Sequence, residues 1–185
     1  MKLVVKRLDI KHLDRQIGDM DTLTDTVDQL MDDWIRERPD LDASGLGITG
    51  RISLLGKVLA REDKRALAPL GLAPWACDVL LALRRQGPPY RLTPTDLRTV
   101  TLLTSGAMTT RLDRLEEAGL VQRSLDSDDR RSFQVDLTEE GRHQADRALE
   151  VRLGMVERLL TPLSPDESQT AAGLLRKLLV GAGPE

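Results

Sequence analysis

The sequence predicts a mainly α-helical protein with one small β-hairpin in its second half. Three observations support this fold class. Most leucine-rich segments repeat their apolar residues at helical spacing, one stretch around residue 135 alternates apolar with polar residues, and proline and glycine separate the segments. With 185 residues and a hydrophobic fraction of 40%, the chain can form a substantial core in one domain with additional helices.

Two helices are expected before the central part of the chain. Residues 1–20 are charged and weakly patterned, which indicates an N-terminal arm that need not be ordered. Apolar residues at helical spacing predict a first helix over about 23–37 and a second from near Ile48 to about Ala68. We therefore expect residues 21–70 to form a segment of N-terminal helices.

The next helix should lie at the centre of the fold. Pro74 suits a first helical position, and the helix is apolar nearly all round from Trp75 to Leu83. Gly87 and the prolines after it end the helix. A helix without a polar face is expected to be buried.

Two shorter helices follow, each beginning at a residue that can cap it. Thr93 is placed to cap a helix that runs to about Val100. Thr104 or Ser105 is placed to cap the next one, which ends at Gly119.

A β-hairpin is expected after these helices. Phe133, Val135 and Leu137 alternate with polar residues, which is the period of a half-buried strand. The segments 120–125 and 132–138 then pair around the turn sequence DSDDRR.

The last 45 residues are expected to form two helices. One begins at Thr138 and runs to about Leu160, and the other begins at Ser164, with Glu167 completing a capping box. Both carry apolar stripes that the small central unit cannot bury: Leu149, Leu153, Val156, Leu160, Leu174, Leu175 and Leu178. A twofold dimer would bury them, so we assign residues 141–185 to dimerisation.

The order of elements over 71–140 is that of a winged helix-turn-helix, which binds double-stranded DNA. The second helix of such a unit lies in the major groove and the hairpin reaches a flanking groove. Met108, Leu112 and Leu115 share one apolar stripe of the expected recognition helix, so the opposite face points towards DNA. The predicted DNA-binding residues on that face and on the wing tip are Thr104, Ser105, Gly106, Thr109, Thr110, Arg114, Arg130 and Arg131.

Charge does not by itself require DNA as the partner. The whole chain has a net charge of −3, and residues 91–131 hold seven arginines and seven acidic residues. Binding would depend on the placement of a few arginines, one of which at the wing tip suits the narrow minor groove. One alternative is that the wing tip is a solvated turn with self-neutralising charges. A separate alternative is a winged helix that binds protein rather than DNA.

Other classes of protein lack support in the sequence. His12 and His143 are far apart, no glycine-rich phosphate loop occurs, and Cys77 is the single cysteine, so no catalytic residues, metal ligands or cofactor are predicted. No apolar run reaches the ~18 residues of a membrane span and no signal peptide opens the chain. We expect a cytoplasmic protein that is not an enzyme and has no membrane partner.

The stretch LTSGAMTTRLDRLEEAGLVQRSLDSDDRRSFQVDLTEEGR resembles the helix and wing of the MarR (multiple antibiotic resistance regulator) family. The similarity extends through GLAPWACDVLLALRR and RLTPTDL and covers roughly residues 25–180. It implies a homodimeric transcriptional regulator, most often a repressor. Such a regulator binds palindromic operator DNA and releases it when a small effector binds.

Two charged residues do not fit a plain core. Asp78 lies within an apolar helix, and Arg111 falls at the edge of the apolar stripe of the recognition helix, so we expect the two to pair. The pair either holds two helices together or lets Arg111 anchor an anionic ligand.

A narrower resemblance supports the ligand. The sequence DQLMDDWIRERPD is similar to the added N-terminal helix of the urate-responsive branch of the family. That branch places a Trp there, an Asp in the central helix and an Arg in the recognition helix. Trp34, Asp78 and Arg111 match these three positions, which implies a pocket for a small anionic effector such as urate or an aromatic acid.

Cys77 suggests a third mode of regulation. One branch of the family senses peroxides with a single cysteine, which lies in its N-terminal helix. Cys77 lies instead in an apolar run, where a thiol is inert, so redox sensing is the alternative to an effector.

Overall fold

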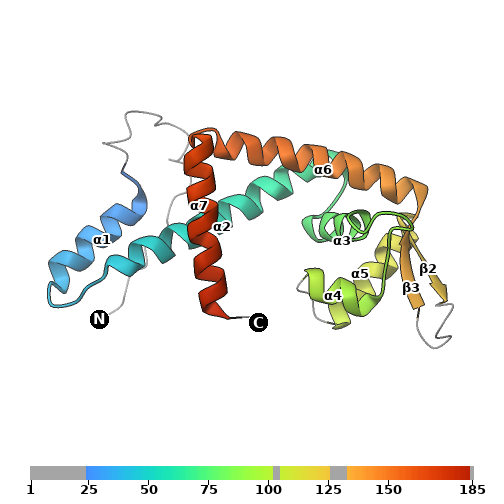
Figure 1. The fold of residues 1–185 in the computed structure, drawn as a ribbon, viewed down its shortest axis with the longest axis horizontal. Helices are drawn as coiled ribbons and strands as arrows, with labels where there is room; N and C mark the ends of the chain where they lie inside the picture. The colour runs from blue at the N-terminus through green and yellow to red at the C-terminus, as the bar shows by residue number, and fades with distance from the viewer. Residues whose placement is uncertain (1–23, 102–104, 126–132, 184–185) are drawn as a thin grey trace. The chain divides into compact units, whose positions relative to one another are not determined.

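The computed structural model describes residues 24–101, 105–125 and 133–183, which form two compact units, Met1–Val58 and Leu59–Glu185. Helices dominate these residues and three short strands form one sheet, which confirms the predicted fold class (Figure 1). The helices are α1 (Thr26–Glu37), α2 (Ser44–Leu67), the 3-10 turn η3 (Ala68–Leu70), α3 (Pro74–Arg84), α4 (Pro94–Thr101), α5 (Ser105–Glu117), α6 (Glu139–Leu160) and α7 (Pro165–Ala182). The strands are β1 (Arg91–Leu92), β2 (Val121–Leu125) and β3 (Phe133–Leu137).

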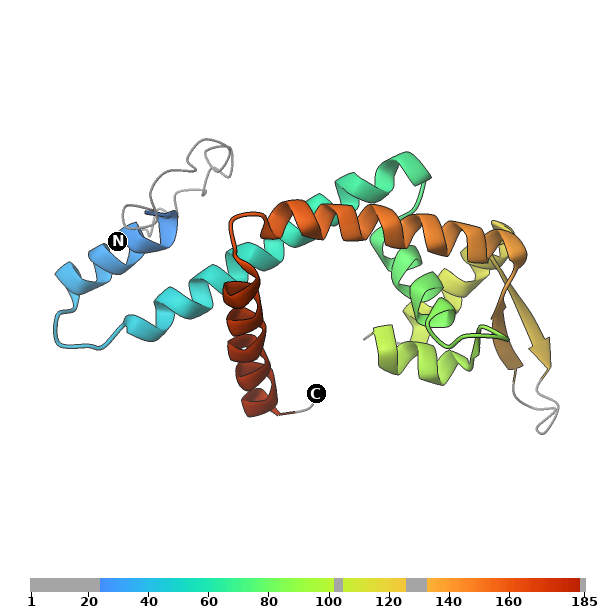
Figure 2. The ribbon, with the colours of Figure 1, turned by 45° about the horizontal axis from the view of Figure 1, so that its top comes forward.

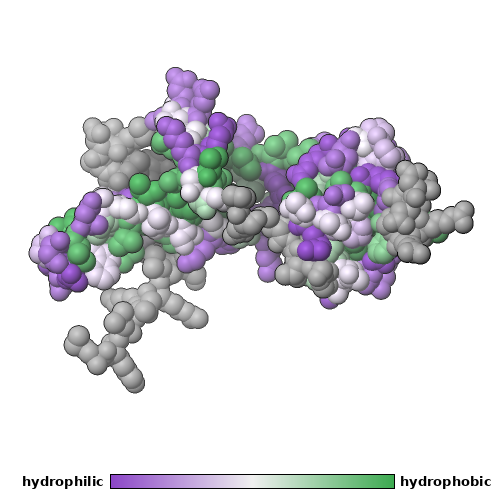
Figure 3. All heavy atoms as spheres, turned by 60° about the horizontal axis from the view of Figure 1, so that its bottom comes forward, coloured by the Kyte–Doolittle hydropathy of each residue, from purple (hydrophilic) through white to green (hydrophobic). Residues whose placement is uncertain are grey.

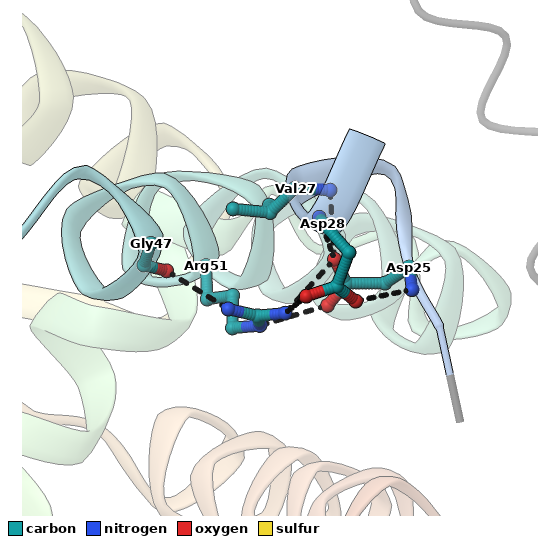
Figure 4. A network of polar contacts seen from close by, with 5 residues as sticks. All are labelled: Asp25, Val27, Asp28, Gly47 and Arg51. Carbon is teal, nitrogen blue, oxygen red and sulfur yellow. Dashed lines mark hydrogen bonds and ion pairs between the residues drawn. The ribbon is translucent and has the colours of Figure 1, made fainter. Parts of the chain in front are cut away.

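In the first unit, a cluster of charges fastens the start of α1 to α2. Asp25 caps α1 by accepting hydrogen bonds from the backbone N–H groups of Val27 and Asp28, and Asp28 accepts one in return from Asp25. Arg51 of α2 donates to both carboxylates, with Nε 2.9 Å from Asp25 Oδ2 and Nη2 2.5 Å from Asp28 Oδ1 (Figure 4). The hydrogen bond from the Asp25 backbone and the one from Arg51 lower the pKa of Asp28 below its ordinary value.

Most apolar side chains of this unit remain at its surface. Val27 is 2% exposed, but a single pair of helices offers little room to bury the others. Figure 3 shows such apolar residues, in green, at the surface of the molecule. The large exposed side chains of the unit are Leu30, Trp34, Ile35, Leu41, Leu46, Ile48, Ile52 and Leu55.

The core of the second unit is built around α3, as its apolar sequence predicts. Six of its residues are buried: Ala76, Cys77, Val79, Leu80, Ala82 and Leu83. They pack with residues of α4, α5, the sheet and α6, which runs beside α3 (Figure 2). The central helix therefore holds together α4, α5, the sheet and the long helix α6.

The sheet has three strands in the order β1–β3–β2, one more than the predicted hairpin. β2 pairs with β3 from Val121↔Leu137 to Leu125↔Phe133, which confirms the expected hairpin strands. β1 adds only Arg91↔Asp136 and Leu92↔Val135. Two residues are too few to show a strand period, which is why the sequence did not predict β1.

Caps define the ends of the helices in this unit. Thr93 Oγ1 accepts a hydrogen bond from the Asp96 backbone, Thr138 caps α6, and Ser164 and Glu167 form the expected capping box of α7. α5 begins at Ser105, and Thr104 lies outside the described residues. In the first unit, α2 begins earlier than predicted, at Ser44, whose backbone N–H donates to Asp42.

Two glycines shape the connection between α5, β2 and α6. Gly119 ends α5 with a φ of 70°, a left-handed conformation that favours glycine. Gly141 lies where a Cβ atom would stand 1.8 Å from the carbonyl oxygen of Leu120. The first turn of α6 therefore packs directly on the backbone at the start of β2.

No single helix among the described residues is long and apolar enough to cross a membrane. Residues 44–70 and 74–84 meet the length and composition test only as a bent pair, and the second of these is the buried helix α3.

Candidate DNA-binding and effector site

One face of α5 packs into the core and leaves the other open. Met108, Leu112 and Leu115 are 1%, 2% and 3% exposed, as the predicted stripe requires. Thr109 and Thr110, on the opposite face, are exposed. Hydroxyl groups on an open helix face can donate to or accept from base edges.

Arg114 follows on the same open face. Its side chain is exposed, and it makes no ion pair with any residue that the structure describes. An arginine without a protein partner can bind a phosphate or the edge of a guanine. The side chain of Ser105, the exposure of Gly106, and all of Thr104, Arg130 and Arg131 lie outside the described part of the structure, so their DNA contacts stay predictions.

Arg98 of α4 is an additional candidate that the sequence reading missed. It is exposed and forms no ion pair within the described ranges. The first helix of a helix-turn-helix crosses the DNA backbone, so an exposed arginine on α4 can contact a phosphate. The sequence could have indicated its exposure. Arg98 directly follows the apolar Leu97, which is buried, and adjacent residues of a helix point to different faces.

Arg123 of β2 joins the wing to the recognition helix, and the sequence reading did not single it out. Its Nη2 lies 2.5 Å from Asp113 Oδ1 and its Nη1 2.9 Å from Glu116 Oε2, both on α5. Its guanidinium also lies over the ring of Phe133, 5.6 Å from the centroid. The alternation of the strand could have revealed that Arg123 faces α5, since residues two apart share one side of a strand and Val121 is buried. Asp113 is therefore engaged by the wing rather than free to face DNA.

The predicted pair of Asp78 with Arg111 is absent, because each has a different neighbour. The side chain of Asp78 is 48% exposed and its Oδ1 accepts from Nη1 of Arg152 on α6 at 2.9 Å. The same arginine binds Asp63 of α2 through two hydrogen bonds of 2.8 and 2.7 Å. Asp78 lies on the open side of α3, so the apolar residues around it in the sequence do not surround its carboxylate. The two carboxylates raise the pKa of the Arg152 guanidinium, chiefly through the Asp63 hydrogen bonds.

Arg111, at the edge of the apolar stripe of α5, turns inward and packs on Trp75. Its guanidinium carbon lies 5.3 Å from the centroid of the Trp75 ring, a cation–π contact. Its Nη1 atom is buried and has no hydrogen-bond partner among the described residues. A buried guanidinium nitrogen without an acceptor is costly, and an anion would satisfy it.

Trp34 lies in the first unit, whereas Asp78 and Arg111 belong to the second. It is 48% exposed and lines a small apolar hollow between α1 and the start of α2. The hollow has a volume of about 290 Å³, and its other lining residues are Val27, Leu30, Met31, Leu46, Thr49 and Gly50.

Cys77 is fully buried beside Leu67 and Ala148. Burial raises the pKa of its thiol to about 11. A thiol in this state is a poor nucleophile, which disfavours the redox-sensing alternative.

Comparison with known proteins identifies the family. A family model described as "MarR family" matches residues 70–132. The HTH-type transcriptional regulator PecS of Dickeya dadantii is 31% identical over 152 residues, covering 82% of this chain and 92% of that protein. The chain belongs to the MarR family. Its predicted membership and its assignment as a transcriptional regulator rather than an enzyme are thereby confirmed.

Solved MarR family structures share the fold. A mutant MarR from E. coli, complexed with operator DNA, matches with a TM-score of 0.64 at 27% identity, over 79% of this chain and 97% of that chain. AbsC of Streptomyces coelicolor matches with a TM-score of 0.70 over 77% of this chain and 96% of its own, at 22% identity, and this likeness concerns the fold alone.

Proposed function

We propose that this MarR family protein is a cytoplasmic repressor that binds palindromic operator DNA as a homodimer and releases it when a small anionic effector binds. The observation that carries the DNA-binding part is the open face of α5. Thr109, Thr110 and Arg114 lie opposite a fully buried stripe, and Arg123 fixes the adjacent wing to the same helix. The E. coli relative in complex with operator DNA supports the same use of these elements.

The parts of the chain take the following roles in this proposal. Residues 21–70 provide the N-terminal helices for dimerisation and effector binding, 71–140 the DNA-binding domain and 141–185 the C-terminal dimerisation helices. The expected N-terminal arm, residues 1–20, lies outside the described residues. The exposed apolar residues of α1, α2, α6 and α7 support dimerisation, because a second copy would remove them from water.

The effector part of the proposal rests on Arg111. Its partnerless Nη1 and its contact with the Trp75 ring suit a planar anion such as urate or an aromatic acid. Trp34 and Asp78 complete the proposed effector residues, with Asp78 held by Arg152 in this structure.

DNA binding is tested by selecting operator duplexes from a random pool and measuring affinity at several salt concentrations. Specific binding through phosphates should weaken steeply with salt, with a slope of log K against log salt of about −0.9 per phosphate neutralised. Arg114→Ala should cost about 1–3 kcal/mol if the arginine contacts a base, and Arg130→Ala should weaken binding through the minor groove. Failure to select any sequence, or binding that is indifferent to salt, would favour a protein-interaction module.

A further inference from the structure

The three strands of the wing share one charge network around a buried carboxylate, whose arginine partner remains partly exposed. Asp136 of β3 is 4% exposed. Among the described residues, it is the one charged residue that is buried. Arg91 of β1 donates from Nε to Asp136 Oδ1 and from Nη2 to Oδ2, the latter at 3.2 Å. Ser124 of β2 donates from Oγ to Asp136 Oδ2 at 2.7 Å. One carboxylate thus receives a bond from each neighbouring strand.

Stability alone does not account for this arrangement. Ionising a buried carboxylate costs free energy that its partners only offset, and apolar residues of similar size often stabilise a fold as well or better. A buried polar network can instead select one arrangement of the chain, because any other leaves the charge without partners.

Register is the arrangement that most needs selection in this sheet. β1 has two residues and pairs with β3 only through Arg91↔Asp136 and Leu92↔Val135. A slip of one residue would turn every side chain of a strand to the other face. A slip of β1 on β3 would turn Arg91 away from Asp136, and the buried carboxylate would keep only the hydrogen bond from Ser124.

The network also lies between the two parts that contact DNA in the proposed function. Arg91 stands two residues before Thr93, which caps α4, the first helix of the helix-turn-helix. β2 and β3 lead directly into residues 126–132, which contain Arg130 and Arg131. The Asp136 carboxylate therefore links the start of the helix-turn-helix to both strands that carry the wing tip.

We propose that Asp136, with Arg91 and Ser124, is a positioning network that sets the wing against the helix-turn-helix so that the wing tip reaches operator DNA. This inference rests on the proposed function and adds to it residues that touch no DNA. Asp136→Asn and Ser124→Ala weaken the network without changing the size of the wing.

A double-mutant cycle in the full-length protein tests the network. Asp136→Asn should weaken operator binding about tenfold in the wild-type background and by less than about twofold in Arg130→Ala, because the displaced tip has then already lost its contact. Its effect should remain about tenfold in Arg114→Ala, whose contact is made by α5. The salt slope should fall by about one in Asp136→Asn, which loss of folded protein alone would not cause.

Matched variants separate the possible outcomes. Gln122→Ala changes the exposed residue that faces Asp136 across β2 and β3, and it should bind as wild type. If Asp136→Asn does not fold, Ser124→Ala, which removes a single hydrogen bond, enters the same cycle with a smaller effect of the same pattern.

Equal losses in the Arg130→Ala and wild-type backgrounds, or an unchanged salt slope, would overturn the network while leaving the wing contact intact. Wild-type affinity in Arg130→Ala itself would refute the wing contact of the proposed function, and with it this role for Asp136.

Discussion

Arg152 and Asp78 form a hydrogen-bonded ion pair of 2.9 Å that joins α6 to α3 across 74 positions of sequence. Asp63 of α2 binds the same guanidinium, so three helices meet at one arginine. Arg152 is thus the cation that balances the charge of Asp78. The sequence-based prediction that Arg111 has this role is wrong. Arg111 is consequently not neutralised by Asp78.

Removal of either carboxylate should destabilise the protein, but to different degrees. Asp63→Asn should lower the free energy of unfolding by about 2 kcal/mol, since the side chain is 16% exposed and makes two charged hydrogen bonds. Asp78→Asn should cost less than about 1 kcal/mol, because its side chain is 48% exposed and water screens the pair. Urea unfolding of the two variants measures both values. A larger loss for Asp78→Asn than for Asp63→Asn would contradict this account of the triad.

The Cys77 thiol should be unreactive in the folded protein. With a pKa of about 11, only about one thiol in a thousand is ionised at pH 8, and the side chain is also fully buried. Reaction with a thiol reagent at pH 8 should therefore be slow until denaturant is added. Operator binding should be unchanged after treatment with peroxide, and equally so in Cys77→Ala. Rapid labelling of the native protein, or loss of DNA binding that Cys77→Ala prevents, would restore redox sensing as the mode of regulation.

A side chain at position 141 should be incompatible with the packing of α6 on β2. Gly141→Ala places its Cβ 1.8 Å from the backbone oxygen of Leu120, which cannot rotate away, so a loss on the order of 3 kcal/mol is expected. Gly154→Ala in the same helix is the control, because its nearest neighbour is the flexible end of Arg158 at 3.6 Å. That change should be neutral or stabilising by up to about 1 kcal/mol. Thermal unfolding of both variants checks the contrast, and similar melting temperatures would refute it.

Dimerisation should depend on the exposed leucines of α6 and α7. Leu153 is 58% exposed and Leu178 50%, although both lie in otherwise well-formed amphipathic helices. Light scattering should find a dimer at micromolar concentration. In that dimer we expect the two recognition helices to lie about one turn of DNA apart, ~34 Å. Leu153→Lys or Leu178→Lys should shift the protein towards monomer, whereas Arg147→Ala on the exposed face of α6 should not. A monomeric wild-type protein would remove the basis for binding palindromic DNA.

The sequence predicted best where one element determines its own periodicity. Met108, Leu112 and Leu115 are buried because a helix repeats every 3.6 residues, whatever packs against it. The two residues of β1 form a strand only because they pair with β3. The residue that pairs with Arg91, Asp136, lies 45 positions away in the sequence, so local periodicity could not reveal the strand. The partner of Asp78 was equally hidden. Apolar residues before and after Asp78 in the sequence do not show whether its own side chain faces the core or solvent. Its pairing with Arg152 could therefore not be inferred from the sequence.

The effector prediction tests whether Arg111 anchors an anion. If it does, urate, salicylate or a related acid should weaken the operator complex, with a coupling of about 1–3 kcal/mol between effector and DNA. Arg111→Met should abolish this response, because the charge on the partnerless Nη1 is lost. Each variant is judged by the ratio of its DNA affinities with and without effector, since α5 is also the proposed DNA-binding helix. Arg147→Met, an exposed arginine of α6, serves as the matched control and should respond as wild type.

Trp34 provides the second arm of the same test. Trp34→Phe should retain DNA affinity and blunt the response if its ring closes the pocket. Tryptophan fluorescence should change on effector binding, and Trp75→Phe separates the signal of Trp34 from that of the ring that packs on Arg111. Should none of these acids alter DNA affinity in the wild type, the anion site at Arg111 is wrong. Should Arg111→Met lose the response while Trp34→Phe keeps it in full, the anion site stands and Trp34 is not part of it.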